Sequence, residues 1–178
     1  LIWVDKGVYL WPETVKHLRK RAGYLVHFTP DTAFYANRSR HFFAAARQYD
    51  LLITTKSFEQ AKYAGIADPE RVYLTTQAYD ADLHCPPSEP LPRKKPVAVF
   101  IGLCERDREE CIEALLTAGV PVRLGGRGWE KFLSTHSSNP ALCFLGSEVF
   151  GDDYVSEYAS AMVGLGLMSK LFPELHTP

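Results

Sequence analysis

Residues 97–126 read VAVFIGLCERDREECIEALLTAGVPVRLGG, and this stretch decides the fold class. The apolar run 97–101 predicts a strand, and Gly102 predicts a turn after it. Residues 105–118 then place Ile112 and Leu116 on one face of a helix, which Gly119 ends. The run 120–124 predicts the next strand. A strand, a helix and a strand in so short a stretch predict a right-handed βαβ unit with parallel strands.

The same alternation of strand and helix continues on both sides of this unit. Further strands are predicted at 1–4, 24–28, 51–54, 71–74, 142–145 and 163–167, and further helices at 12–22, 38–49, 57–64 and 152–161. Ser57 and Gln60 predict a capping box at the start of one helix. In the last helix the spacing predicts that Met162 faces the core. The whole pattern predicts an α/β fold built around largely parallel sheets.

Five prolines between Pro86 and Pro96 interrupt this pattern. Proline is not tolerated in a helix interior or a central strand, so we interpret 86–96 as an interdomain linker. Residues 1–85 would then form part of an N-terminal Rossmann-like domain, and 97–178 a C-terminal Rossmann-like domain. The basic residues 93–95 fit a solvated linker better than a binding patch.

The composition excludes several classes of function. The chain has 20 basic and 21 acidic side chains, and this formal net charge of -1 argues against nucleic acid as a partner. The longest apolar stretches, 97–104 and 161–168, are too short for a transmembrane segment. The four cysteines form no C-x-x-C pair, and the histidines form no H-x-x-x-H pair, so we expect no metal site. Free thiols predict a reducing, cytoplasmic compartment.

Both ends of the sequence look cut. The chain opens directly on a strand pattern at Leu1 without an initiator methionine, and it stops at Pro178 without an evident closing element. We therefore interpret the sequence as a fragment in which the C-terminal domain is incomplete.

Ligands of open parallel sheets bind beyond the carboxyl ends of the strands, so the residues that follow each strand are the candidates. Gly102 and the helix start after it could hold a diphosphate, with Arg106 or Arg108 as the cation. An acidic first turn that only stabilises the helix is the alternative, because Glu105, Asp107 and Glu109 cluster there. No G-x-G-x-x-G fingerprint is present.

Four further strand ends carry candidate residues. Gly126 and Arg127 suit a phosphate or a sugar hydroxyl, unless the glycines only let a strand turn into a helix. Asp31 could be a general base for an acceptor hydroxyl, provided that its environment raises its pKa toward neutrality, or it could be an ordinary turn residue. Lys170 follows the last predicted strand. Its ammonium would face a cleft between the two halves of the chain, or it is an ordinary surface lysine. Lys6 could simply pair with Asp5.

Short runs spread over nearly the whole chain carry a resemblance. They are WVDKG at 3–7, LVHFTPD at 25–31, YDLLITTKS at 49–57, YDADLH at 79–84, FIG at 100–102, GGRGW at 125–129, FLG at 144–146, SK at 169–170 and PELHT at 173–177. With these runs in this order, the chain resembles the CgeB-type, spore-maturation glycosyltransferase family.

The resemblance implies the GT-B architecture, with two Rossmann-like domains facing across a cleft and a nucleotide-sugar donor held mainly by the C-terminal domain. Such enzymes usually need no metal or other cofactor, because cationic side chains and a helix dipole stabilise the leaving diphosphate. By position it implies Asp31 on the acceptor side, Gly102, Arg106 and Lys170 near the phosphates, Gly126 and Arg127 on the donor side, and Leu145, Gly146 and Ser147 near the base.

The chain departs from the family pattern at two places. An Arg-Thr-x-Glu stretch normally follows the His-Thr run, and its carboxylate, which would hold the donor, is missing after Pro178. Many members carry a second acidic residue after Pro-Asp, where this chain has Thr32, so a paired-carboxylate base is not expected.

Three functions fit these observations. The leading hypothesis is an enzyme, a glycosyltransferase of hexosyl type, that moves a sugar from a nucleotide-sugar donor to an unknown hydroxyl acceptor. The alternative is a non-catalytic sugar- or nucleotide-binding module on the same scaffold, because a fold alone does not fix function. A nucleotide-sugar epimerase is the third.

Overall fold

The computed structural model describes residues 1–86 and 93–169. The chain forms two compact units, the first of which is Leu1–Ala78, and the second begins at Tyr79. Most of the predicted linker, 86–96, lies outside the described residues, as do Lys170 and the run 173–177. The role of that linker therefore stays a prediction.

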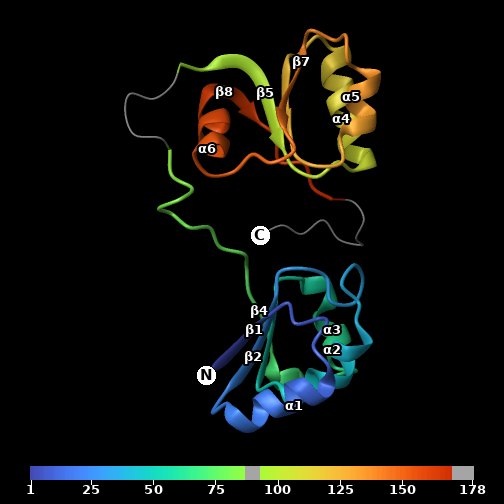
Figure 1. The fold of residues 1–178 in the computed structure, drawn as a ribbon, viewed down its shortest axis with the longest axis vertical. Helices are drawn as coiled ribbons and strands as arrows, with labels where there is room; N and C mark the ends of the chain where they lie inside the picture. Colours follow the sequence, from blue (N-terminus) through green and yellow to red (C-terminus); the bar gives the residue numbers. More distant parts are fainter. Residues whose placement is uncertain (87–92, 170–178) are drawn as a thin grey trace. The chain divides into compact units, whose positions relative to one another are not determined.

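The first unit is a four-stranded parallel sheet with helices packed on one face (Figure 1). Its strands, in the order β1-β2-β3-β4, are β1 (Ile2–Asp5), β2 (Leu25–Thr29), β3 (Leu51–Thr54) and β4 (Val72–Leu74). Its helices are α1 (Pro12–Arg21), α2 (Arg40–Ala45) and α3 (Gln60–Tyr63), with 3-10 turns η1 (Ala46–Gln48), η2 (Ser57–Glu59) and η3 (Pro69–Arg71).

Alternation along the strands explains this layering. Val4, Leu25 and Leu52 point to one face of the sheet and are buried against the helices. The helices contribute Phe42 and Tyr63, among others, to the same core. In α1, Pro12 opens the helix and basic residues fill the last turn, which suits the negative end of the helix dipole.

The second unit is also a parallel sheet, with strand order β7-β6-β5-β8. The strands are β5 (Lys95–Ile101), β6 (Val122–Gly125), β7 (Leu142–Gly146) and β8 (Ala161–Gly164), and the helices are α4 (Arg106–Thr117), α5 (Glu130–Thr135) and α6 (Gly151–Ser160). Helices α4 and α5 cover one face, and α6 packs on β5 and β8 (Figure 1). The predicted α/β fold with parallel sheets is therefore confirmed.

Several predicted elements were wrong in detail. Ser57 was predicted to cap a helix, but it is the first residue of η2, and the residues at the N-cap positions of η2 and α3 are Lys56 and Glu59. Pro96 lies inside β5, a central strand, where the pairing with β8 shifts its register between Lys95 and Ala98. Proline lacks the N–H that a regular ladder needs and is tolerated at such an irregularity.

Two errors concern the C-terminal part. Helix α5 was not predicted, because its six residues are too few to show a helical period. Strand β8 begins at Ala161, earlier than the predicted 163, so Met162 is a strand residue with 63% of its surface exposed and not part of the core.

Two expectations from the composition concern the state of the cysteines and the ability of a helix to cross a membrane. All four cysteines are free thiols, as predicted. Burial and the nearby Glu109 raise the pKa of Cys104 to about 11, so this thiol is a poor nucleophile at neutral pH. Within residues 1–86 and 93–169, no helix is both long and apolar enough to cross a membrane.

Candidate functional site

Three neighbouring strands of the second unit end in glycines at the same edge of the sheet. Gly102 follows β5, and its N–H donates to the carbonyl of Gly125 at the end of β6 over 2.9 Å. The N–H of Gly126 donates to the carbonyl of Gly146, at the end of β7, also over 2.9 Å. These bonds continue the ladder beyond the strands, so the three turns form one surface, on which Gly102, Gly126 and Gly146 are partly exposed.

Gly126 cannot be replaced without moving the backbone of this surface. Its φ is +117°, and a Cβ atom there would lie 2.1 Å from the carbonyl oxygen of Gly102. The same carbonyl oxygen also accepts a hydrogen bond of 2.9 Å from Nε1–H of the fully buried Trp129, which holds it in place. The predicted strand-to-helix turn at 125–129 is therefore a site of close backbone approach as well.

A cavity of about 490 Å³ opens on this edge of the sheet, and its volume is in the usual range for small-molecule pockets. The residues that line it include Gly102, Leu103, Gly126, Arg127, Ser147 and Phe150. Its walls are mainly apolar, and the polar side chains among its lining residues are those of His84, Arg127, Ser147 and Tyr154. Such a mixture suits a ligand that has a flat or apolar part and an anionic part.

Arg127 supplies positive charge beside the cavity. Its side chain is 69% exposed and pairs with the carboxylate of Glu148. An exposed pair of this kind contributes little to stability, because water screens both charges. An anionic ligand can therefore take the guanidinium from Glu148 at low cost.

The structure brings together most of the residues predicted for the donor side. Gly102, Gly126, Arg127 and Ser147 line the cavity, and Gly146 adjoins it through its bond to Gly126. Lys170 lies outside the described residues.

Arg106 is not brought to the cavity. It lies in the first turn of α4 with 88% of its side chain exposed, and its Nε is 3.1 Å from a carboxylate oxygen of Glu110. The acidic first turn of α4, with Asp107 and Glu109, fits the alternative of simple helix stabilisation.

Arg108, the other cation considered for this helix start, is turned toward the backbone. Its Nη1 donates to the carbonyl of Leu103 over 2.9 Å, and its Nε donates to the carbonyl of Leu167 over 3.1 Å. It also pairs with Glu105 at 3.2 Å. Arg108 thus holds the loop that carries Leu103 at the cavity wall.

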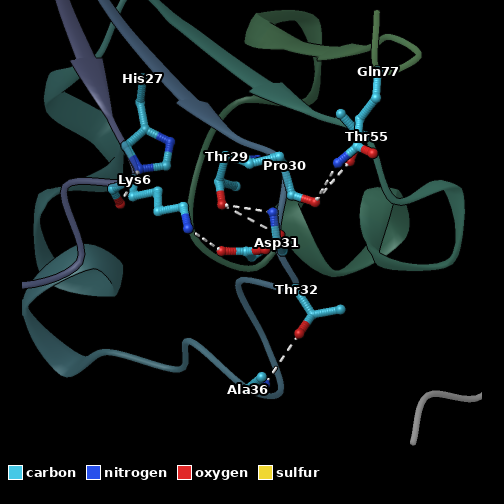
Figure 2. Close-up of polar contacts among 9 residues, drawn as sticks. All are labelled: Lys6, His27, Thr29, Pro30, Asp31, Thr32, Ala36, Thr55 and Gln77. Atoms are coloured by element: carbon cyan, nitrogen blue, oxygen red, sulfur yellow. Dashed lines mark hydrogen bonds and ion pairs between the residues drawn. The ribbon is translucent and has the colours of Figure 1, made fainter. Parts of the chain in front are cut away.

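A second cluster lies at the carboxyl ends of β1 and β2 in the first unit (Figure 2). The ammonium of Lys6 is 2.7 Å from a carboxylate oxygen of Asp31, and this carboxylate raises the pKa of Lys6. Lys6 therefore forms an ion pair with Asp31, whereas the alternative in the sequence analysis was a simple pair with Asp5. The pair places a carboxylate and an ammonium together at the strand ends where ligands of parallel sheets bind.

The loop that carries Asp31 is held from several sides (Figure 2). The Pro30 carbonyl accepts from the hydroxyl of Thr55 over 3.0 Å, and the Asp31 N–H donates to the Thr29 hydroxyl over 3.2 Å. Thr32 stands where many members of the CgeB-type family carry a second acidic residue. It is buried, and its hydroxyl accepts from the N–H of Ala36. Thr32 thus stabilises the turn.

Glu59 is a residue of this region that sequence reasoning missed. Its side chain is fully buried, and its two carboxylate oxygens accept from the N–H groups of Ala33 and Phe34 over 2.8 and 2.9 Å. Burial raises the pKa of this carboxyl, while the two hydrogen bonds oppose that shift. Glu59, which lies in η2 after β3, anchors the loop, and no local sequence pattern indicates a contact with residues so distant in the chain.

Comparisons with known proteins identify the fold. No family model matches the chain, and no curated protein matches it in sequence. Among solved structures it is similar to AviGT4, a glycosyltransferase involved in avilamycin A biosynthesis, with a TM-score of 0.50 and 16% identity over 86% of this chain and 49% of that one. The lipopolysaccharide outer core galactosyltransferase WaaB in its apo form gives a TM-score of 0.44 and 11% identity over 77% of this chain and 41% of WaaB.

The fold is therefore the α/β fold of GT-B glycosyltransferases, with two units that are each built on a parallel sheet. The chain spans about half the length of AviGT4. At this identity the likeness concerns the fold alone, and membership of the CgeB-type family stays a prediction.

Proposed function

We propose that the chain is the part of a glycosyltransferase that holds a nucleotide-sugar donor in the cavity of its second unit and transfers the sugar to a hydroxyl acceptor. The observation that carries this proposal is the edge where β5, β6 and β7 end. There the backbones of Gly102 and Gly126 lie open to the cavity beside the guanidinium of Arg127. Fold likeness and the resemblance to the CgeB-type family support it.

The cavity offers a contact for each part of such a donor. The glycine surface allows a diphosphate to approach the backbone closely, and Arg127 can neutralise its charge as the bond to the sugar breaks. The ring of Phe150, 73% exposed at the cavity wall, offers a face for a nucleobase. Ser147 supplies a hydroxyl for the ribose or the base. This scheme uses no metal, which stays a prediction.

Asp31 is the proposed general base. It would accept the proton of the acceptor hydroxyl as that oxygen forms its bond to the anomeric carbon and the bond from this carbon to the diphosphate breaks. The ion pair with Lys6 holds this carboxylate at the end of β2. A hexose as the transferred sugar and a cytoplasmic location also remain proposals.

The same ion pair favours one alternative, a non-catalytic module that binds a sugar or nucleotide. In such a module Lys6 and Asp31 only neutralise one another and take part in no reaction. Slow hydrolysis of a bound nucleotide sugar, reduced by Asp31→Asn, is expected of a transferase. Binding without any turnover in both proteins is expected of the module.

Arg127→Ala is expected to weaken binding of the cognate nucleoside diphosphate at least about tenfold, because it removes a charge-assisted hydrogen bond to phosphate. Isothermal titration calorimetry with UDP, GDP, ADP and dTDP measures the effect and identifies the base. Arg106→Ala is the matched control: it removes the same charge from an exposed position away from the cavity and should leave the affinity unchanged. An equal loss in both variants, or none in either, would contradict the donor site.

A further inference from the structure

Lys6 has a backbone conformation that lysine seldom adopts. Its φ is +59°, in the left-handed region, and the following Gly7 has a φ of +42°. These two residues turn the chain sharply at the end of β1, where the Lys6 N–H donates to the carbonyl of Phe28 over 2.8 Å. Residues other than glycine and asparagine seldom adopt this backbone conformation without strain, so neighbouring groups must hold the turn in place.

His27 is the side chain that holds this turn (Figure 2). It lies on the core face of β2 with 1% of its surface exposed, and its Nε2 is 3.0 Å from the carbonyl oxygen of Lys6. Its ring stacks on Phe42 at 4.4 Å between centroids and meets the ring of Tyr49 edge-on at 5.1 Å. The imidazole therefore has a single position, directly behind the turn.

The hydrogen bond defines which nitrogen carries the proton. A carbonyl oxygen can only accept, so Nε2 must donate and Nδ1 must carry the lone pair. Among residues 1–86 and 93–169, Nδ1 is buried and has no hydrogen-bond partner. An apolar ring would fill this aromatic site without leaving an acceptor unpaired. The presence of histidine is therefore explained by its Nε2–H and the carbonyl that it binds.

We propose that His27 is a positioning residue, whose bond to the Lys6 carbonyl holds the left-handed turn. The turn places the Lys6 ammonium against Asp31 and so orients that carboxylate for the acceptor hydroxyl. Only the role of the carboxylate rests on the proposed function. The arrangement of the three side chains stands on their contacts, and a test of it needs neither donor nor acceptor.

NMR of the full 178-residue chain tests the arrangement in two steps. In the wild-type protein, the ¹⁵N shifts of the His27 ring are expected to show a proton on Nε2 at neutral pH. A proton on Nδ1 instead would overturn the proposal, and this measurement needs no variant.

The second step follows the titration of the Lys6 ammonium, which the carboxylates of Asp31 and Asp5 face. Asp31→Asn is expected to lower the pKa of Lys6. His27→Phe should lower it in the same direction although Asp31 is intact, because the turn loses its donor. His27→Gln, whose amide N–H can donate to the same carbonyl, should restore most of the wild-type value. A wild-type titration of Lys6 in folded His27→Phe would overturn the proposal.

These results are independent of the proposed function. Failure of every nucleotide to bind would remove the donor site but leave the titration of Lys6 unchanged. Conversely, a Lys6 that ignores His27 would remove the positioning role while nucleotide binding by the second unit continues.

Discussion

Gly126→Ala is expected to lower the free energy of unfolding of the second unit by about 4 kcal/mol and to abolish nucleotide binding. Two costs add. A left-handed φ of +117° strains any side chain, and the new methyl group would lie 2.1 Å from the Gly102 carbonyl oxygen. Because Nε1–H of Trp129 donates to that same oxygen, the Gly102 turn cannot move away without losing this hydrogen bond.

Denaturant unfolding followed by tryptophan fluorescence measures this loss. Trp129 is buried in the second unit, whereas Trp3 and Trp11 are exposed in the first and can be replaced by phenylalanine in all proteins compared. Gly166→Ala is the matched control, since nothing lies within 4 Å of a Cβ there and its φ is not left-handed. It should change stability by less than about 1 kcal/mol. Equal stability of the two variants would show that the glycine surface does not have this geometry.

The second large effect is a dependence of the first unit on pH. Burial lowers the pKa of His27 from 6.5 to about 4. As the pH falls below 6.5, the unfolded chain binds a proton at this position that the folded chain does not bind. The contribution of a neutral His27 is therefore complete above pH 6.5 and is lost as the pH falls toward 4. The loss amounts to about 3 kcal/mol.

His27→Gln isolates this contribution, because glutamine can donate to the Lys6 carbonyl but does not titrate. Denaturant unfolding at pH 7 and pH 4 should show that the variant loses about 3 kcal/mol less than the wild-type protein between the two conditions. All other titrating groups are shared, so their effects cancel in the comparison. An identical loss in both proteins would mean that His27 is protonated in the folded state or is not buried.

Much of the fold could be predicted because the chain marks its strands with short apolar runs and ends them with glycine or polar residues. The strand at 51–54 was predicted with its observed bounds, and most others within one or two residues. Gly102 and Gly126 could be predicted as candidate residues for the same reason. A glycine after a buried strand indicates a tight turn at the edge where ligands bind.

The rest depends on contacts between residues distant in sequence. Arg106 and Arg108 are two residues apart, yet one is exposed beside Glu110 and the other binds the backbone at Leu103 and Leu167. Which of the two arginines is exposed depends on how helix α4 packs, and the sequence alone does not show this. The carboxylate of Glu59 serves N–H groups about 25 residues away, and its burial has no local signal.

The most direct test of the donor site is an amide chemical-shift titration of the ¹⁵N-labelled chain with the nucleoside diphosphates and their sugars. The account predicts that one of them shifts the amide signals of Gly102, Gly126 and Ser147 in a saturable manner, while signals from β1 to β4 stay in place. Saturable shifts confined to the first unit, or none with any nucleotide, would contradict a donor site in the second unit.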